Sequence, residues 1–277
     1  MIILRRIFDS TNAIMNDLYS LSSLIESIGT DRLTVGLQEF APGIYTQVTT
    51  IAQTIITPIA LSFLALYALL ELISISNKIG PGNVGWELMA GWAIKFGLGY
   101  IMVTQSLTLL TALFDIGLTF VGGVSAANIG GDLLDYASMR DVISEMNLGE
   151  QLSLQASVLL VTFIMRLGSI FINIKITMRM LEIYAYIALA PIPLSTIAGG
   201  ESSQMAKSFL KNFAAAVIQG VLIMLFLSMA SGMYLTLMPG VTDDFVGAIW
   251  GMAGFMIMLI MAIVASETTA KKVIGVM

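Results

Sequence analysis

Long apolar stretches, separated by short polar connections, run through most of this sequence. Each stretch is long enough to cross about 30 Å of hydrocarbon as a helix that rises about 1.5 Å per residue. The pattern therefore predicts an all-α, polytopic integral membrane protein. We expect five full spans, at about residues 48–75, 88–113, 152–174, 213–237 and 246–265.

The residues before the first membrane helix pair (47–113) show a weaker, amphipathic pattern. Apolar positions recur there at helical spacing, and charged or polar residues occupy the opposite face. The apolar positions are Leu4, Ile7, Ile14, Leu18, Leu21, Ile25 and Ile28. Residues 1–46 are therefore interpreted as an extramembrane region with an N-terminal amphipathic helix, which either lies on the bilayer surface or docks a partner subunit.

Residues 183–198 are as apolar as a membrane span, but Pro191 and Pro193 interrupt them. Proline removes a backbone donor, and its ring collides with the preceding helical turn. We therefore expect a re-entrant, proline-broken segment within the membrane core of residues 152–265. Its freed carbonyls cannot face lipid, so protein or water must enclose it. A sixth full span is the alternative.

Lysine and arginine near the ends of the spans favour the arrangement with five spans, because basic residues gather on the cytoplasmic side. In this arrangement the tail of residues 266–277 is cytoplasmic. The cytoplasmic set is Lys78, Lys175, Arg179, Lys207, Lys211, Lys271 and Lys272, and the outer set is Arg32 and Arg140. Six spans divide the same residues less unevenly.

The largest internal hydrophilic segment, residues 114–151, then lies on the outer face. It is strongly acidic, with Asp115, Asp132, Asp135, Asp141, Glu145 and Glu150 against a single Arg140. After a run of small residues we expect a short helix from Leu133. An acidic surface repels phosphate groups, so the segment is expected to dock a partner protein rather than nucleic acid. A solvated loop without a partner is the alternative.

Composition limits the chemistry of this chain. It contains no Cys and no His, and only 11% of its residues are charged whereas 57% are hydrophobic. Thiolate and imidazole metal sites, cysteine nucleophiles and His-dependent triads are therefore excluded. We predict no catalytic residue, no cofactor and no metal site.

Two charged residues fall at similar depth in the first two predicted spans, Glu71 in one and Lys95 in the next. Unpaired charges inside a membrane are costly, so an ion pair between neighbouring helices is expected. The alternative is that Lys95 extends its ammonium group to the inner surface.

The third span carries a polar stripe at helical spacing, formed by Gln155, Thr162, Arg166, Ser169, Asn173 and Thr177. Arg166 falls near the middle of the bilayer, and we place no acidic residue at that depth. It therefore needs a water-filled conduit, the carbonyls of the broken segment or a partner subunit. The stripe either packs against the broken segment or lines a conduit.

Small residues predict where helices approach one another closely. Ala216 and Gly220 are four residues apart in the fourth span, and Gly247 and Gly251 form the same spacing in the fifth. Such pairs allow helix backbones to come into contact within a membrane.

The run from Ala188 to Leu194, Ala-Leu-Ala-Pro-Ile-Pro-Leu, is followed by a polar turn, a basic amphipathic stretch ending at Phe213 and a long apolar span. This order resembles the core of the TrbL-like polytopic subunit of type IV secretion and conjugation systems, over roughly residues 150–272. The tail Ser266–Lys272 is similar to those of members from Gram-positive conjugative elements. Where proteobacterial members have aromatic and arginine residues after the proline segment, this chain has Gly199-Gly-Glu-Ser-Ser203.

The resemblance implies a non-enzymatic, multi-pass subunit of the bacterial cytoplasmic membrane. Members of that family multimerise in a channel that translocates DNA and protein, together with other secretion subunits and separate ATPases. The resemblance thus implies a homo-oligomer in the lipid bilayer with transient contact to translocating DNA or protein. Two other hypotheses remain, a solute transporter or ion channel, in which broken helices also occur, and a structural membrane scaffold.

Overall fold

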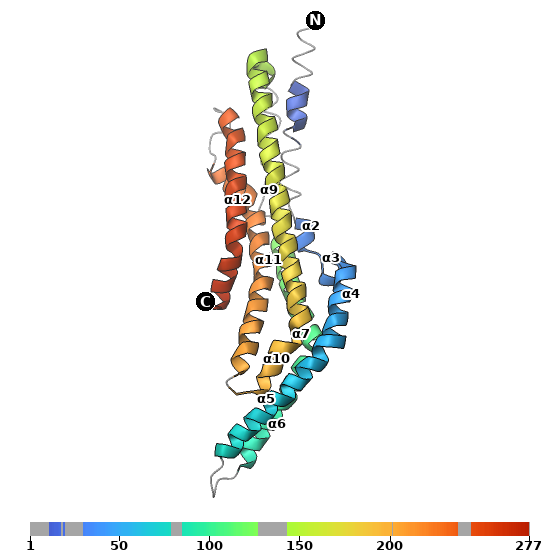
Figure 1. The fold of residues 1–277 in the computed structure, drawn as a ribbon. Coiled ribbons are helices and arrows are strands. Elements are labelled where there is room, and N and C mark those ends of the chain that lie inside the picture. Colours follow the sequence, from blue (N-terminus) through green and yellow to red (C-terminus); the bar gives the residue numbers. More distant parts are fainter. Residues whose placement is uncertain are drawn as a thin grey trace. The chain divides into compact units, whose positions relative to one another are not determined.

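The computed structural model describes residues 11–17, 19, 30–78, 85–126, 143–200, 202–237 and 245–276. Throughout this part of the chain the secondary structure is helical, without a strand (Figure 1). The elements are α2 (Thr30–Leu33), α3 (Leu37–Phe40), α4 (Pro42–Ile51), the π-helical turn η1 (Ala52–Ile56), α5 (Thr57–Lys78), α6 (Trp86–Thr104), α7 (Ser106–Ala126), α9 (Leu148–Leu189), α10 (Pro191–Ser195), the 3₁₀ turn η2 (Thr196–Ala198), α11 (Ser203–Leu237) and α12 (Phe245–Ile274).

Among the described residues, five helical stretches are long and apolar enough to cross a membrane. The predicted fold class, an all-α polytopic membrane protein with five such helices, is confirmed. The stretches are Pro42–Asn77, Ser106–Ser125, Gly149–Leu189, Ser203–Ala230 and Ile249–Ile274.

The first stretch contains a π-helical turn whose cause is a proline. Pro58 has no backbone N–H to donate to the carbonyl four residues earlier, so the regular helical ladder is interrupted there. The Thr57 hydroxyl donates to the Ala52 carbonyl oxygen at 2.8 Å, across five residues. The helix thus passes Pro58 without ending.

The second predicted span, 88–113, is wrong in its bounds. The apolar run is divided at Gln105, which leaves helical geometry between α6 and α7. Residues 114–126, which we assigned to the acidic connection, continue α7, because one carboxylate, that of Asp115, does not stop a run rich in helix-compatible apolar residues. The span-length helix is α7. Residues 127–142, including the helix expected from Leu133, lie outside the described part.

The start of the broken segment also differs from the prediction. α9 is one helix of 42 residues that continues through residues 183–189, and the break falls at Ala190. Proline restricts only the residue before it and the bonds at its own position, which leaves the earlier residues free to stay helical. At about 1.5 Å per residue α9 is roughly 63 Å long, about twice the hydrocarbon thickness, so part of it extends beyond the membrane core.

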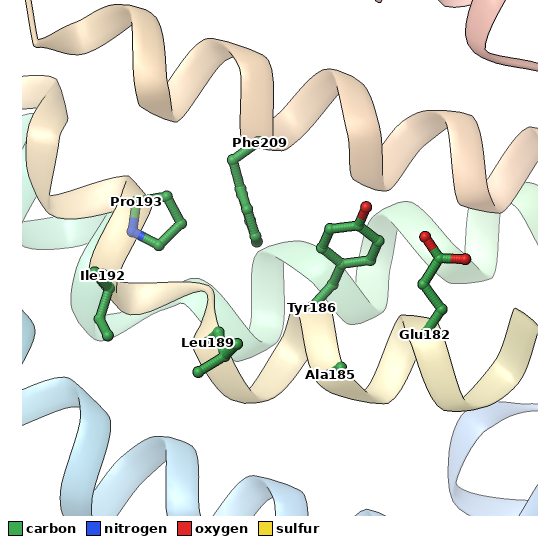
Figure 2. A pocket seen from close by; sticks show the side chains of 7 residues that line it. All are labelled: Glu182, Ala185, Tyr186, Leu189, Ile192, Pro193 and Phe209. Atoms are coloured by element: carbon green, nitrogen blue, oxygen red, sulfur yellow. The ribbon is translucent and has the colours of Figure 1, made fainter.

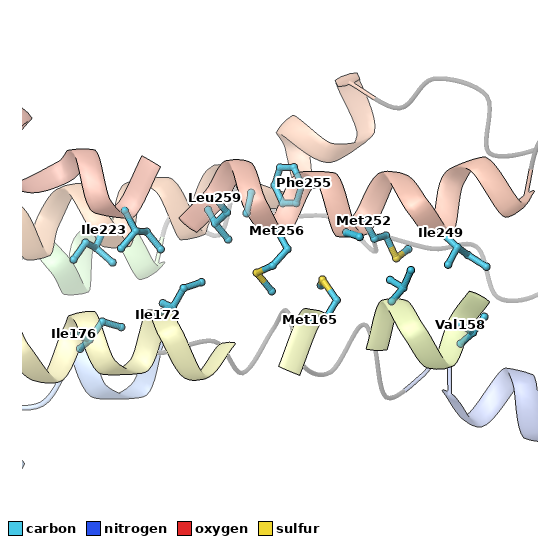
Figure 3. Packing of buried hydrophobic residues seen from close by; sticks show 14 of the residues in the cluster. Val158, Met165, Ile172, Ile176, Ile223, Ile249, Met252, Phe255, Met256 and Leu259 are labelled. Atoms are coloured by element: carbon cyan, nitrogen blue, oxygen red, sulfur yellow. The ribbon is translucent and has the colours of Figure 1, made fainter. Parts of the chain in front are cut away.

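The chain divides into two compact units. Unit 1 comprises residues 1–34, 121–177 and 221–266, and unit 2 comprises residues 35–120, 178–220 and 267–277. In unit 1, α9 packs against α11 and α12 through buried apolar side chains, several of them methionines (Figure 3). Met165, Met252 and Met256 fill this core, consistent with methionine as an adaptable packing residue. Because Gly168 has no side chain, the Met256 side chain can pack directly against α9 at this position.

The N-terminal region contributes to the same core. Residues 11–17 are helical, and Ile14 and Met15 are buried against unit 1 together with Leu33. The amphipathic face is therefore covered by the chain itself at these positions, rather than by the bilayer surface as one reading of the sequence had it. The remaining apolar positions of this predicted helix lie outside the described residues.

Unit 2 has a separate core, formed by residues of α3, α5, α6, α7, α9, α10 and α11. The Tyr184 hydroxyl donates to the Leu37 carbonyl oxygen at 2.6 Å and so fixes the end of α9 to α3. The hairpin of α5 and α6 packs on α10 and η2. This hairpin positions the proline turn described below.

We expect the contact between α7 and α11 to leave no space for a methyl group at Gly117. A Cβ built on Gly117 would overlap the Val217 Cγ1 methyl group, and a β-branched side chain cannot turn away easily. Gly117→Ala should therefore destabilise the folded chain by about 1–3 kcal/mol. Thermal unfolding in detergent, followed by circular dichroism, measures this. Gly97→Ala on α6 is the matched control, because a Cβ there meets nothing within 4 Å. Equal melting temperatures for the two variants would contradict the contact.

Candidate functional site

The proline turn, residues 190–200, is held by its own hydroxyl groups and buried by its neighbours. The Ser195 hydroxyl donates to the Ile192 carbonyl oxygen at 2.7 Å, and the Thr196 hydroxyl donates to the Pro193 carbonyl oxygen at 2.8 Å. Both side chains are buried. In the structure the turn packs against α5 and α6 of the same chain.

Glu71 connects the two members of this hairpin to the end of the turn. Its Oε1 lies 3.5 Å from the Lys95 Nζ, and its Oε2 accepts a hydrogen bond from the Gly200 backbone N–H at 3.0 Å. The structure therefore brings Glu71 and Lys95 together, and it adds a contact to the proline turn that the sequence had not indicated. Trp92 ties the hairpin further, since its Nε1 donates to the Ala68 carbonyl oxygen at 2.9 Å.

A buried arginine joins α9 to α11 beside the turn. Arg179 is only 4% exposed. Its Nε donates to the Ala216 carbonyl oxygen at 2.9 Å, its Nη2 donates to the Val217 carbonyl oxygen at 3.4 Å, and its Cζ lies 6.0 Å from the centroid of the Phe114 ring. These contacts compensate a charge that has lost its water.

Gly220 provides the space for this guanidinium. A Cβ built on Gly220 would overlap the Cζ and both Nη atoms of Arg179. Sequence analysis counted Arg179 among the basic residues of the cytoplasmic side and did not predict that its side chain is buried. The signal that could have found it is the Ala216–Gly220 pair, which we read as a site of contact between helix backbones and which admits a side chain instead.

Polar side chains from three helices meet next to this arginine. Glu182 of α9, Asn212 and Gln219 of α11, and Glu267 and Lys271 of α12 line a cavity of about 10 Å³. The Lys271 Nζ lies 2.8 Å from the Glu267 Oε1, and Gln219 is only 4% exposed. A space of this size holds about one water molecule.

A larger, apolar groove follows α9 to the proline turn. It has a volume of about 400 Å³ and is lined by Glu182, Ala185, Tyr186, Leu189, Ile192, Pro193 and Phe209 (Figure 2). The Tyr186 ring lies edge-on to Phe209 and Phe213, with centroids 5.6 and 6.0 Å apart. This groove is called the turn groove below.

The polar stripe of α9 lies in unit 1 and is satisfied mainly by its own helix. Thr162 is buried and donates to the Val158 carbonyl oxygen at 2.7 Å, and the Asn173 Nδ2 donates to the Ser169 carbonyl oxygen at 3.0 Å. Gln155 is partly buried. The stripe thus needs no conduit to satisfy these groups.

Arg166 differs from the rest of the stripe because its side chain is exposed. α9 continues without a break to Leu189, so about seven helical turns separate Arg166 from Pro191 in the chain. Local hydroxyl groups, rather than this guanidinium, serve the carbonyls at the turn. Contact between Arg166 and the broken segment, one of the environments we expected for it, stays a prediction.

Among the described residues, no three Asp or Glu side chains come together in a way that could hold a metal ion. Around the turn, neighbouring helices are held together by the buried charge of Arg179, by its backbone carbonyl partners and by close contacts at glycines.

Comparison with known protein families gives a match over more than half of the chain. A family model described as TrbL/VirB6 plasmid conjugal transfer like protein matches residues 24–191 of the 277. The match extends through the α5–α6 hairpin and all of α9 to the first residue of α10. Searches of curated proteins and of solved structures gave no match.

We expect Gly220 and Arg179 to depend on one another. Gly220→Ala should destabilise the chain by at least about 2 kcal/mol, because it expels a buried guanidinium from its carbonyl partners. In an Arg179→Met background the same substitution should cost less than about half as much, since a flexible thioether can move aside. Thermal or denaturant unfolding of the four chains of this double-mutant cycle measures the coupling. Equal costs in both backgrounds would show that Gly220 serves another contact.

Proposed function

Because the chain belongs to the TrbL/VirB6 plasmid conjugal transfer-like family, we propose that it is a channel subunit of a type IV secretion apparatus that transfers DNA by conjugation. The family supplies membrane subunits to such systems, so other secretion subunits are its partners. Several copies of the chain assemble in the bacterial cytoplasmic membrane. Separate ATPases provide the energy for transport, and this chain has no catalytic role.

The extent of the family match supports the proposal. It covers all of α9 and the α5–α6 hairpin, which packs on the proline turn, and it ends at Pro191, the second residue of that turn. The length of α9 also fits, because a helix of 42 residues can cross the membrane and still contact subunits beyond it. Residues 266–277 face the cytoplasm in this arrangement.

Arg166 carries the argument for a channel. Its exposed side chain lies on α9 among exposed apolar neighbours, Phe163 at 59%, Leu167 at 52% and Ile170 at 56%. Within the described residues no hydrogen bond or ion pair of Arg166 is found. A guanidinium in the centre of a bilayer costs at least roughly 2.5–3.5 kcal/mol on insertion scales. This face of α9 is therefore not a lipid-facing one, and it meets either water in a conduit or another subunit.

The two competing hypotheses lack such support. A solute transporter would be expected to show an internal inverted repeat, which the sequence does not have. A purely structural scaffold would be served better by leucine than by arginine at position 166. The translocated DNA or protein contacts the chain only transiently in our proposal, and the acidic residues between α7 and α9, Asp132, Asp135, Asp141 and Glu145, favour a protein partner there.

Substitution of Arg166 tests this proposal. Arg166→Leu should insert into the membrane as well as the parent chain, since it removes a charge, but should abolish plasmid transfer. Arg166→Lys should retain part of the transfer activity, because the charge survives while the planar fork is lost. Phe163→Leu is the control on the same face and should transfer normally. The measurements are the amount of membrane-inserted protein and the transfer frequency. Normal transfer by Arg166→Leu at equal protein level would overturn the assignment.

A further inference from the structure

The polar cavity between α9, α11 and the end of α12 contains a buried amide that needs a partner. The Gln219 side chain lines this cavity and is only 4% exposed. Within the part of the chain that the structure describes, this side chain forms no hydrogen bond with another residue. Buried polar groups nearly always bond to protein or to water, because an amide that loses its water without replacement is costly. Gln219 therefore points to a ligand in the cavity.

The size and charge of the cavity determine what the ligand can be. A space of about 10 Å³ admits one molecule of the size of water. The charges of the lining are already balanced, since the Lys271 Nζ lies 2.8 Å from the Glu267 Oε1 and Arg179 interacts electrostatically with Glu182. An ion of either sign would disturb this balance and would also lose its hydration shell. A water molecule adds no charge, and it can both donate to carboxylates and accept from an amide.

The same cavity lies where the end of α12 joins unit 2. Residues 267–277 belong to this unit, but among the described residues the apolar core of unit 2 includes none of their side chains. Within residues 267–276 the buried side chain is the small one of Ala270. A polar contact is found instead, because the Lys211 Nζ of α11 donates to the Gly275 carbonyl oxygen at 3.3 Å. Hydrogen bonds, more than apolar burial, therefore attach this segment to unit 2.

We propose that the polar cavity binds one water molecule, which accepts a hydrogen bond from the Gln219 amide and donates to the carboxylates of Glu182 and Glu267. Figure 2 shows Glu182 extending from α9 toward α11, the helix that carries Gln219. The water thereby joins three helices and completes the attachment of residues 267–277. Because opening this contact exposes little apolar surface, the end of α12 can detach while the core of unit 2 stays packed. The site does not depend on the place of the chain in a secretion apparatus.

Hydrogen exchange of the full chain in detergent tests the role of the water. Gln219→Leu removes the bridge, so the amides of residues 271–274 should exchange about fivefold faster, the factor that corresponds to one hydrogen bond of about 1 kcal/mol. Gln47→Leu, at an exposed position of α4 in the same unit, is the matched control and should leave this exchange unchanged. If Gln219 had no partner, its replacement would remove an unsatisfied group and exchange would slow. Unchanged or slower exchange in Gln219→Leu would overturn the proposal.

A structure of the parent chain at a resolution that shows ordered water locates the ligand directly, even if Gln219→Leu does not fold. One peak of density should lie within about 2.6–3.2 Å of the Gln219 amide and of a carboxylate oxygen of Glu182 or Glu267. A cavity without this peak would overturn the proposal. A melting temperature that rises with sodium or potassium chloride, but not with choline chloride at equal ionic strength, would show a cation in the cavity and would overturn it as well.

Discussion

Polar backbone and charged groups that lie away from water must find partners within the protein, and this constraint explains the arrangement around the proline turn. Pro191 and Pro193 free carbonyls that a continuous helix would have used. The Ser195 and Thr196 hydroxyls donate to the Ile192 and Pro193 carbonyl oxygens, which lie further along the turn than the carbonyls that the prolines free, and the α5–α6 hairpin packs on the turn. The hairpin in turn depends on Glu71, whose carboxylate accepts the Gly200 N–H and contacts Lys95.

Glycines determine how closely these helices approach one another. In unit 2, a different group occupies the space beside each of these glycines. Gly99 faces Leu64 and Ala198, and Gly220 faces the Arg179 guanidinium. A single methyl group at Gly220 would displace a buried charge. The centre of the contact between α9 and α11 is therefore formed by the Arg179 guanidinium and backbone carbonyls. Its edge, where the turn groove begins, is apolar. Such contacts set the position of α9, the helix that carries Arg166.

Hydrophobic pattern alone predicted the fold class and the number of span-length helices, because burial of apolar stretches in lipid is a local property of the sequence. It placed the helix ends less well. The break at Gln105 and the continuation of α9 to Leu189 depend on packing between helices, which periodicity does not encode. Glu71 and Lys95 were placed at similar depth from the sequence, and the structure brings their side chains together. The burial of Arg179 was missed, because a basic residue near a span end is ordinarily an interfacial one.

The central claim is that the face of α9 around Arg166 contacts water or another subunit rather than lipid. The absence of native cysteines allows single-cysteine variants to test it directly in membranes. Ile170→Cys, one turn from Arg166, should form a disulfide-linked dimer on mild oxidation or react with a water-soluble maleimide. Leu66→Cys, equally apolar and exposed on α5, should do neither if that face meets lipid. An Ile170→Cys variant as inert as Leu66→Cys would contradict the account.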